Sequence, residues 1–132
     1  MKWFLKVLSQ YADFKGRACR EEYWMYYLFC IIFGIVTSIL DGLLGLNTIE
    51  GVGYGVITSI CILALLVPSW AVSVRRLHDV GKSGWMFLII LIPIVGIIWL
   101  VVLLVADSQP GVNQYGANPK EKSAHSNLSG DY

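Results

Sequence analysis

The sequence is short of charged residues and of cysteine. Asp, Glu, Lys and Arg make up 14% of the 132 residues, against about 25% in an average soluble domain. This balance excludes a disordered chain, and a net charge of only +1 excludes a strongly basic nucleic-acid-binding protein. The 3 cysteines lie far apart, which argues against a disulfide framework and a zinc site. No cleavable signal peptide is evident before the first long apolar run.

The sequence also lacks the short motifs that are typical of enzymes. It contains no serine nucleophile elbow, phosphate-binding glycine loop, HExxH motif or paired-carboxylate arrangement. His78 and Asp79 are adjacent, but neighbouring residues on a helix do not face the same way, and two such groups do not complete a zinc site. We therefore expect no catalytic residue, no cofactor and no metal.

Apolar residues are abundant, at 56% of the chain, and the mean hydropathy is +0.63. They gather in runs at about 23–44, 54–74 and 85–106, each long enough to cross a membrane as a helix. The composition thus predicts an all-α membrane protein with one membrane domain over 1–120 and a disordered C-terminal tail over 121–132. Pro93 and Gly96 interrupt the third run, which is either a full span, the reading we favour, or a re-entrant hairpin.

The segment before the first span has an amphipathic pattern. Residues 1–12 place aromatic and aliphatic side chains on one helical face and lysines on the other, which predicts a short helix in the membrane interface. Lys and Arg number five before the first span, none between the first and second, and three in residues 75–84. The positive-inside rule therefore places the N-terminus and the 75–84 loop in the cytoplasm.

Polar residues cluster where the first span begins and where the second ends. On the cytoplasmic side the two clusters could meet, with Glu21 or Glu22 pairing with Arg75 or Arg76. Such arginines either hold the loops inside by snorkelling or bind the phosphate of anionic headgroups through forked donors. The candidate headgroup or partner contacts are Arg17, Arg20, Glu22, Arg75, Arg76, His78, Asp79 and Lys82. Residues 109–119 are rich in turn residues, and they form either a specified loop or a plain surface tail.

The polar motifs resemble those of one bacterial family. They read Phe14-x-Gly16-Arg17, Arg20-x-Glu22-Tyr23-Trp24, Arg75-Arg76-Leu77-His78-Asp79 with Ser83-Gly84-Trp85, and Asn113-x-Tyr115-Gly116-x-Asn118-Pro119. From about residue 3 to residue 120 the chain resembles the inner-membrane family catalogued as domain of unknown function 805 (YhaH-type proteins). The resemblance implies a small multi-pass protein of the bacterial inner membrane. It implies no established activity, so no catalytic residue is carried over.

We predict a non-enzymatic interaction protein that sits in the lipid bilayer and binds anionic phospholipid or a membrane-protein partner through its Arg-rich face. Homo-oligomerisation is a further expectation, since Gly34, Ser38 and Gly42 form a small-residue stripe. Two alternatives stay open. One is a subunit of an oligomeric small-solute or proton pathway that uses Asp41 and His78. The other is an enzyme that modifies lipid headgroups with His78 and its neighbouring carboxylate.

Overall fold

The computed structural model describes residues 2–46, 50 and 53–121. In chain order these form α1 (Lys2–Ser9), α2 (Arg20–Leu43), α3 (Val56–Asp79), the 3-10 helix η1 (Gly84–Leu91) and α4 (Val95–Val105). Within these residues the β structure is limited to one isolated bridge, between Asn113 and Gly116. This part of the chain is therefore all-helical, as the composition predicts. The predicted disorder of residues 121–132 lies, but for the first of them, outside the described residues.

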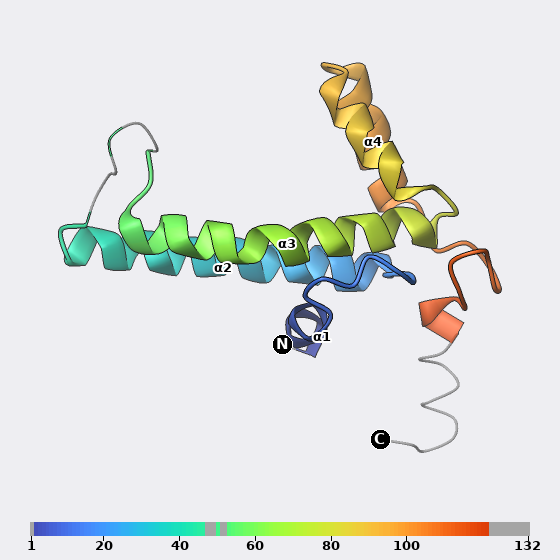
Figure 1. Ribbon diagram of the computed structural model, residues 1–132, viewed down its shortest axis with the longest axis horizontal. Coiled ribbons are helices and arrows are strands. Elements are labelled where there is room, and N and C mark those ends of the chain that lie inside the picture. Colours follow the sequence, from blue (N-terminus) through green and yellow to red (C-terminus); the bar gives the residue numbers. More distant parts are fainter. Residues whose placement is uncertain (1, 47–49, 51–52, 122–132) are drawn as a thin grey trace.

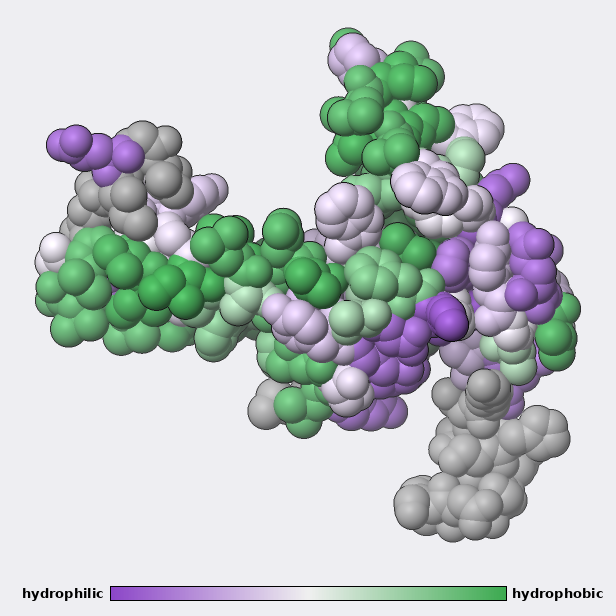
Figure 2. All heavy atoms as spheres, viewed as in Figure 1, coloured by the Kyte–Doolittle hydropathy of each residue, from purple (hydrophilic) through white to green (hydrophobic). Residues whose placement is uncertain are grey.

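Helices α2 and α3 run antiparallel, side by side, as a long hairpin (Figure 1). Each has 24 residues, which corresponds to about 36 Å of helix. Both are long and apolar enough to cross a membrane, and they overlap the first two predicted runs. Helix α3 continues to Asp79, however, so residues 75–79 are helical and do not belong to the predicted 75–84 loop. Many apolar side chains of the two helices are exposed, such as Ile31 at 61% and Leu63 at 69%. Figure 2 shows this apolar surface along the hairpin. Most of the hydrophilic residues gather at the end where α2 begins and α3 ends.

Asp41 joins the two helices near the turn of the hairpin. Its side chain is buried and accepts hydrogen bonds from the backbone N–H groups of Ile57 and Thr58, both at 2.9 Å, and from the Thr58 hydroxyl at 2.7 Å. A carboxylate in this position satisfies the free N–H groups of a helix start. Gly55 leaves room for it, since a Cβ there would lie 2.2 Å from the Asp41 Cγ. Asp41 thus caps α3.

The third apolar run is not the continuous span that we favoured from the sequence. It breaks at residues 92–94, where Pro93 interrupts the helix and Ile94 has a φ of 64°. Helix α4 has only 11 residues, or about 16 Å, roughly half of the hydrocarbon thickness of a bilayer. Gly96 brings the two pieces together, because a Cβ there would lie 1.8 Å from the carbonyl oxygen of Ile89. The outcome is a tight η1–α4 hairpin that projects sideways from α3 (Figure 1), as in the re-entrant alternative.

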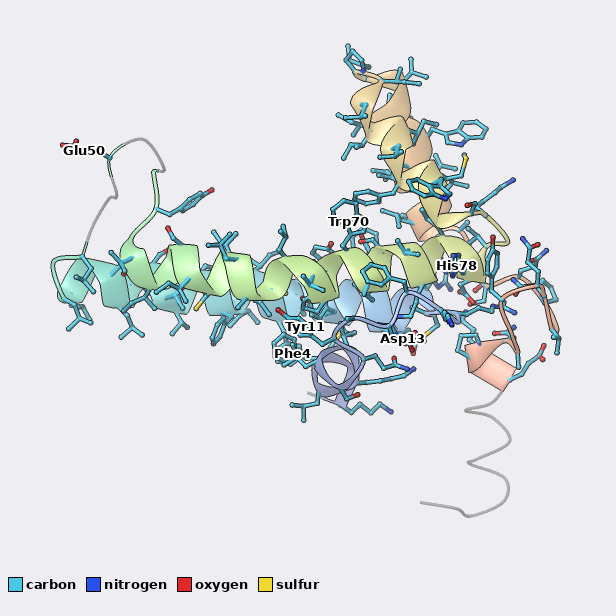
Figure 3. The ribbon with its side chains drawn as sticks, viewed as in Figure 1. Phe4, Tyr11, Asp13, Glu50, Trp70 and His78 are labelled. Atoms are coloured by element: carbon cyan, nitrogen blue, oxygen red, sulfur yellow. The ribbon has the colours of Figure 1, made fainter. Side chains whose placement is uncertain are left out.

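The apolar core lies where α2 begins and α3 ends. Leu100, Leu103 and Leu104 of α4 are buried there in one cluster with Val72 and Leu77 of α3. Helix α1 crosses beneath the α2–α3 hairpin at this end (Figures 1 and 3). It packs Phe4 against Tyr26 with ring centroids 5.6 Å apart, and Val7 is fully buried. Part of the apolar face of α1 therefore contacts protein.

Candidate functional site

Most of the charged residues that the structure describes lie at one end of the α2–α3 hairpin. This end, which we call the charged end, comprises the start of α2, the last three turns of α3, and the segments packed around them. All nine residues from 71 to 79 are buried, and Arg75, Arg76, Glu22 and Asp79 are among the largest fully buried side chains. Figure 3 shows His78 at this end and Glu50 near the opposite end. Buried charges must be paired to offset their lost hydration.

Asp79 is the centre of the first ion-pair network. Its Oδ1 accepts a hydrogen bond from Arg17 Nε at 3.0 Å, and its Oδ2 accepts from Arg76 Nη1 at 2.6 Å and from Ser108 Oγ at 2.5 Å. The three charged side chains are each at most 1% exposed. This carboxylate therefore links α3 to the linker before α2 and to the segment after α4.

Arg17 uses all five of its N–H donors inside the chain. Besides the bond to the Asp79 carboxylate, Nη1 donates to the carbonyl oxygens of Gly111 at 2.8 Å and Gly116 at 3.3 Å. Nη2 donates to the carbonyl oxygens of Asp79 at 3.2 Å and Gln109 at 2.5 Å. A planar guanidinium with five fixed donors suits such convergent acceptors. Arg17 thus holds the turns of residues 109–116 in place, so the dense turn residues do form a specified loop.

Arg76 likewise holds the end of α4 through hydrogen bonds to backbone carbonyl oxygens. Its Nε donates to the carbonyl oxygen of Leu104 at 3.0 Å, and its Nη2 donates to the carbonyl oxygen of Ala106. The N–H of Gln109 in turn donates to the carbonyl oxygen of Asp79 at 2.8 Å. The end of α4 and the segment after it are therefore tied to the end of α3.

Glu22 is the centre of a second network. Its Oε1 accepts from Arg75 Nη1 at 3.0 Å and its Oε2 from Lys6 Nζ at 2.8 Å. The pairing of Glu22 with Arg75, one of those considered from the sequence, is thus present. Arg75 Nη1 also donates to Gln10, whereas its buried Nε and Nη2 have no acceptor among the described residues. This network attaches α1 to both helices of the hairpin.

The remaining candidates lie apart from these networks. Arg20 and Lys82 are exposed. His78 donates from Nδ1 to the carbonyl oxygen of Gly16 at 3.0 Å, and its ring stacks on that of Tyr115 with centroids 3.8 Å apart. Two of the eight candidates therefore present charge to the surroundings, and headgroup binding by any of them stays a prediction.

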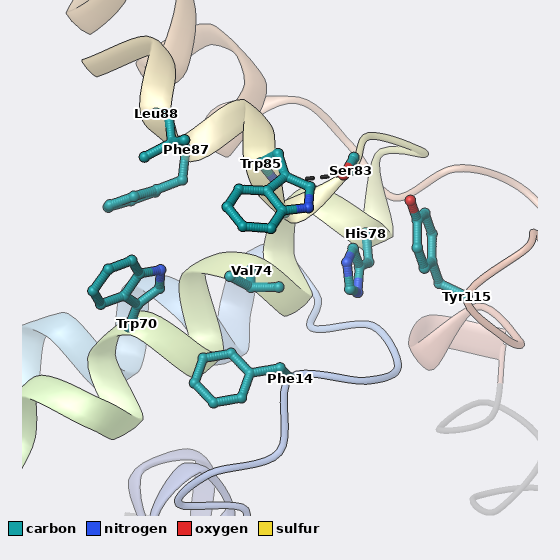
Figure 4. A pocket seen from close by; sticks show the side chains of 10 residues that line it. Phe14, Trp70, Val74, His78, Ser83, Trp85, Phe87, Leu88 and Tyr115 are labelled. Carbon is teal, nitrogen blue, oxygen red and sulfur yellow. Dashed lines mark hydrogen bonds between the residues drawn. The ribbon is translucent and has the colours of Figure 1, made fainter. Parts of the chain in front are cut away.

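A pocket of about 500 Å³ lies beside the charged end, between α3 and η1 (Figure 4). Trp70, Val74 and His78 line it from α3 at intervals of four residues, which puts them on one helix face. Phe14 closes it from the linker and Tyr115 from the C-terminal loop. The other lining residues are Ser83, Gly84, Trp85, Phe87 and Leu88. Sequence reasoning missed this pocket because four separate segments build it.

The cysteines and the acidic residues that the structure describes do not form a metal site. No group of three or more His, Cys, Asp or Glu residues is placed to hold a metal ion within the described residues. Cys19 is 3% exposed, and burial raises the pKa of its thiol, which makes it a weak nucleophile near neutral pH.

Comparisons with known proteins agree with the motifs. A family model described as a protein of unknown function (DUF805) matches residues 11–117. The inner membrane protein YhaH of Escherichia coli K12 is 43% identical over 120 residues, which cover 91% of this chain and 98% of the relative. The inner membrane protein YhaI is 36% identical over 91% of this chain and 97% of its own length. The uncharacterized protein YiiR is 33% identical over 78% of this chain and 62% of its own length. No solved structure matches.

Proposed function

Because the chain belongs to the DUF805 family, whose members are proteins of unknown function, we propose a role from the geometry of its own residues. It is an inner membrane protein like its relatives. Our proposal is a non-enzymatic interaction protein that binds anionic lipid through the charged end of the hairpin. The proposal depends on one contrast at the charged end. Its buried arginines form ion pairs inside the chain, whereas the cations Arg20 and Lys82 are exposed.

The proposed topology has two membrane crossings, α2 and α3. The positive-inside rule places the N-terminus, the end of α3 and the loop that follows it in the cytoplasm. Arg76 and Asp79 hold residues 104–109 at the same end of α3. The C-terminal segment is therefore cytoplasmic as well, α1 lies at the cytoplasmic interface, and the η1–α4 hairpin enters only the inner leaflet.

The bend of the η1–α4 hairpin pairs three of its backbone donors within itself. In a bilayer an unpaired backbone N–H is costly, because no water replaces the missing acceptor. Here the N–H groups of Ile92, Val95 and Gly96 donate to the carbonyl oxygens of Ile89, Pro93 and Ile92 at 3.0, 2.7 and 3.1 Å, respectively. Pro93 has no N–H to satisfy. The bend therefore needs no partner subunit to supply hydrogen-bond acceptors for these groups.

Reporter fusions test this topology. An alkaline phosphatase and a fluorescent-protein reporter would be placed after residue 46, after residue 83 and after residue 121. We expect phosphatase activity only after residue 46, and fluorescence at the other two positions, because they share the cytoplasmic side. Opposite sides for residues 83 and 121 would show a third crossing and overturn the proposed topology.

Lipid binding is tested at the exposed cations. The double variant Arg20→Gln with Lys82→Gln removes two charges, each of which contributes about 1 kcal/mol near an anionic surface. We expect affinity for phosphatidylglycerol to fall roughly thirtyfold at low salt, with binding to a zwitterionic lipid unchanged. Arg20→Lys with Lys82→Arg is the matched control, since it keeps both charges. Equal affinity of the unmodified chain for the two lipids would contradict the proposal.

The alternative functions have less support. A proton pathway through Asp41 would need a carboxylate that exchanges protons, whereas three donors from the start of α3 hold this one as a cap. A lipid-modifying enzyme would need His78 and Asp79 to act on one substrate. Their side chains instead contact different partners, Gly16 and Tyr115 for His78 and the two arginines for Asp79.

A further inference from the structure

The pocket between α3 and η1 has an uncharged lining. Its walls are mostly aromatic and aliphatic, and none of the lining residues is Asp, Glu, Lys or Arg. The polar groups are the His78 ring, the Ser83 hydroxyl and the Tyr115 phenol, which belong to α3, the α3–η1 loop and the C-terminal loop. Ser83 Oγ accepts a hydrogen bond from the Trp85 N–H at 3.4 Å, so its own proton is left to donate. This lining suits a hydrocarbon chain joined to an ester or hydroxyl group.

The pocket is continuous with an exposed apolar surface of the molecule. Trp70 and Leu88 line it and are 50% and 46% exposed. Trp70 and Phe87, whose ring centroids are 6.2 Å apart, also line a second cavity of about 190 Å³ that reaches Leu66 and Tyr27. The two hollows therefore follow the outside of α3 from the charged end toward the middle of the hairpin. An extended chain fits such a path better than a compact solute does.

Positive charge lies beside this apolar space. Lys82 directly precedes the lining residue Ser83, and Lys15 directly follows the lining residue Phe14; both lysines are exposed. The two lysines belong to two different segments, each next in sequence to a lining residue, and neither lines the pocket. Cations outside an apolar pocket complement an amphiphile with an anionic head and an apolar chain.

We propose that this pocket holds one acyl chain of an anionic phospholipid from the inner leaflet. The ester group of the lipid lies near Ser83, and its phosphate lies near Lys15 and Lys82. This inference rests on the proposed function and deepens it, because it names the lipid class and the place of its chain. The chain occupies the space beside Trp70 and Leu88.

A pair of matched substitutions tests the pocket. Leu88→Trp fills the space from η1, whereas Leu91→Trp makes the same change on the same element at a residue that is 77% exposed and does not line the pocket. Binding of dioleoyl phosphatidylglycerol to the detergent-purified full chain would be measured by native mass spectrometry. Glycerol phosphate would serve as a headgroup without a chain. We expect Leu88→Trp to weaken phosphatidylglycerol binding about tenfold. This decrease corresponds to excluding fewer than two methylene groups of the acyl chain from the pocket. Leu91→Trp should not weaken it.

A second measurement uses the unmodified chain and so does not depend on the folding of a variant. Phosphatidylglycerol with a photoreactive group in its acyl chain would be crosslinked in vesicles, and the modified peptides identified. We expect crosslinks within residues 70–78 and 84–88 that excess unlabelled phosphatidylglycerol suppresses. Crosslinks there that excess lipid does not suppress, or equal binding by both tryptophan variants, would overturn the pocket. The proposed function is judged separately, by whether the chain prefers phosphatidylglycerol over a zwitterionic lipid. If the pocket is overturned but this preference remains, the proposed function stands. If the preference is absent, the proposed function fails as well.

Discussion

Asp79 is the residue whose replacement tests the charged end most directly. Asp79→Asn keeps the size and shape of the side chain but removes its charge. The carboxylate has no exposed side-chain surface and is the counterion of both Arg17 and Arg76. Asparagine would leave these two buried guanidinium groups without it, and its amide N–H₂ would face donors instead of acceptors.

The expected cost follows from this burial. Removing one partner of a buried ion pair destabilises a protein by about 3–5 kcal/mol, because the other charge stays unpaired. We take this range for the whole substitution, since the retained amide oxygen still accepts one hydrogen bond. A chain of this size loses roughly 4 °C of melting temperature for each kcal/mol, so the expected decrease is about 12–20 °C. The loss is a large share of the about 5–15 kcal/mol that stabilises a typical domain.

The assay has a global and a local readout. Melting of the helical signal in detergent measures the first, and limited proteolysis between residues 104 and 116 measures the second, because Asp79 and its arginines hold this segment. Asp107→Asn is the matched control. Its carboxylate is 65% exposed and pairs with Lys120 at the surface, so we expect no change in either readout. An unchanged melting temperature and protease pattern for Asp79→Asn would refute the buried network.

Three further predictions concern close packing and thiol chemistry. Gly55→Ala should lower the melting temperature by displacing the Asp41 cap, whereas Gly34→Ala, whose Cβ would meet no atom within 4 Å, should be neutral or stabilising. Gly96→Ala should prevent closure of the η1–α4 hairpin, which would be detected as faster proteolysis of residues 84–105. Cys19 should react with maleimide more slowly than a free cysteine at pH 8, and faster as the pH rises, because burial raises its pKa and keeps the thiol protonated. A rate equal to that in denaturant would contradict the burial of Cys19.

The sequence predicts the helices of the hairpin and the places where charge gathers, because these depend on local composition. The runs near 23–44 and 54–74 overlap α2 and α3, although α3 extends to Asp79, and membrane insertion depends on the average hydropathy of such a run. The sequence also indicates the pairing of Glu22 with Arg75 as one of a few options. Opposite charges at one end of two apolar helices must pair if they are buried.

Tertiary structure decided the third run. Pro93 and Gly96 allowed both a kinked span and a hairpin, and hydropathy does not distinguish them. The difference is made by contacts distant in sequence: Gly96 against the backbone of η1, and Arg76 on the carbonyl oxygens of Leu104 and Ala106. Backbone carbonyls are present at every residue, so they leave no signature from which such partners could be read.

For the same reason, the sequence predicts one part of the candidate site and the fold determines the other. That Arg17 and Arg76 belong to a polar cluster follows from the sequence alone. That their donors are taken up inside the chain, while Arg20 and Lys82 remain exposed, depends on which segments the fold brings around the end of α3. The pocket is likewise a product of the fold, because Phe14, Trp70 and Tyr115 meet only when the linker, α3 and the C-terminal loop pack together.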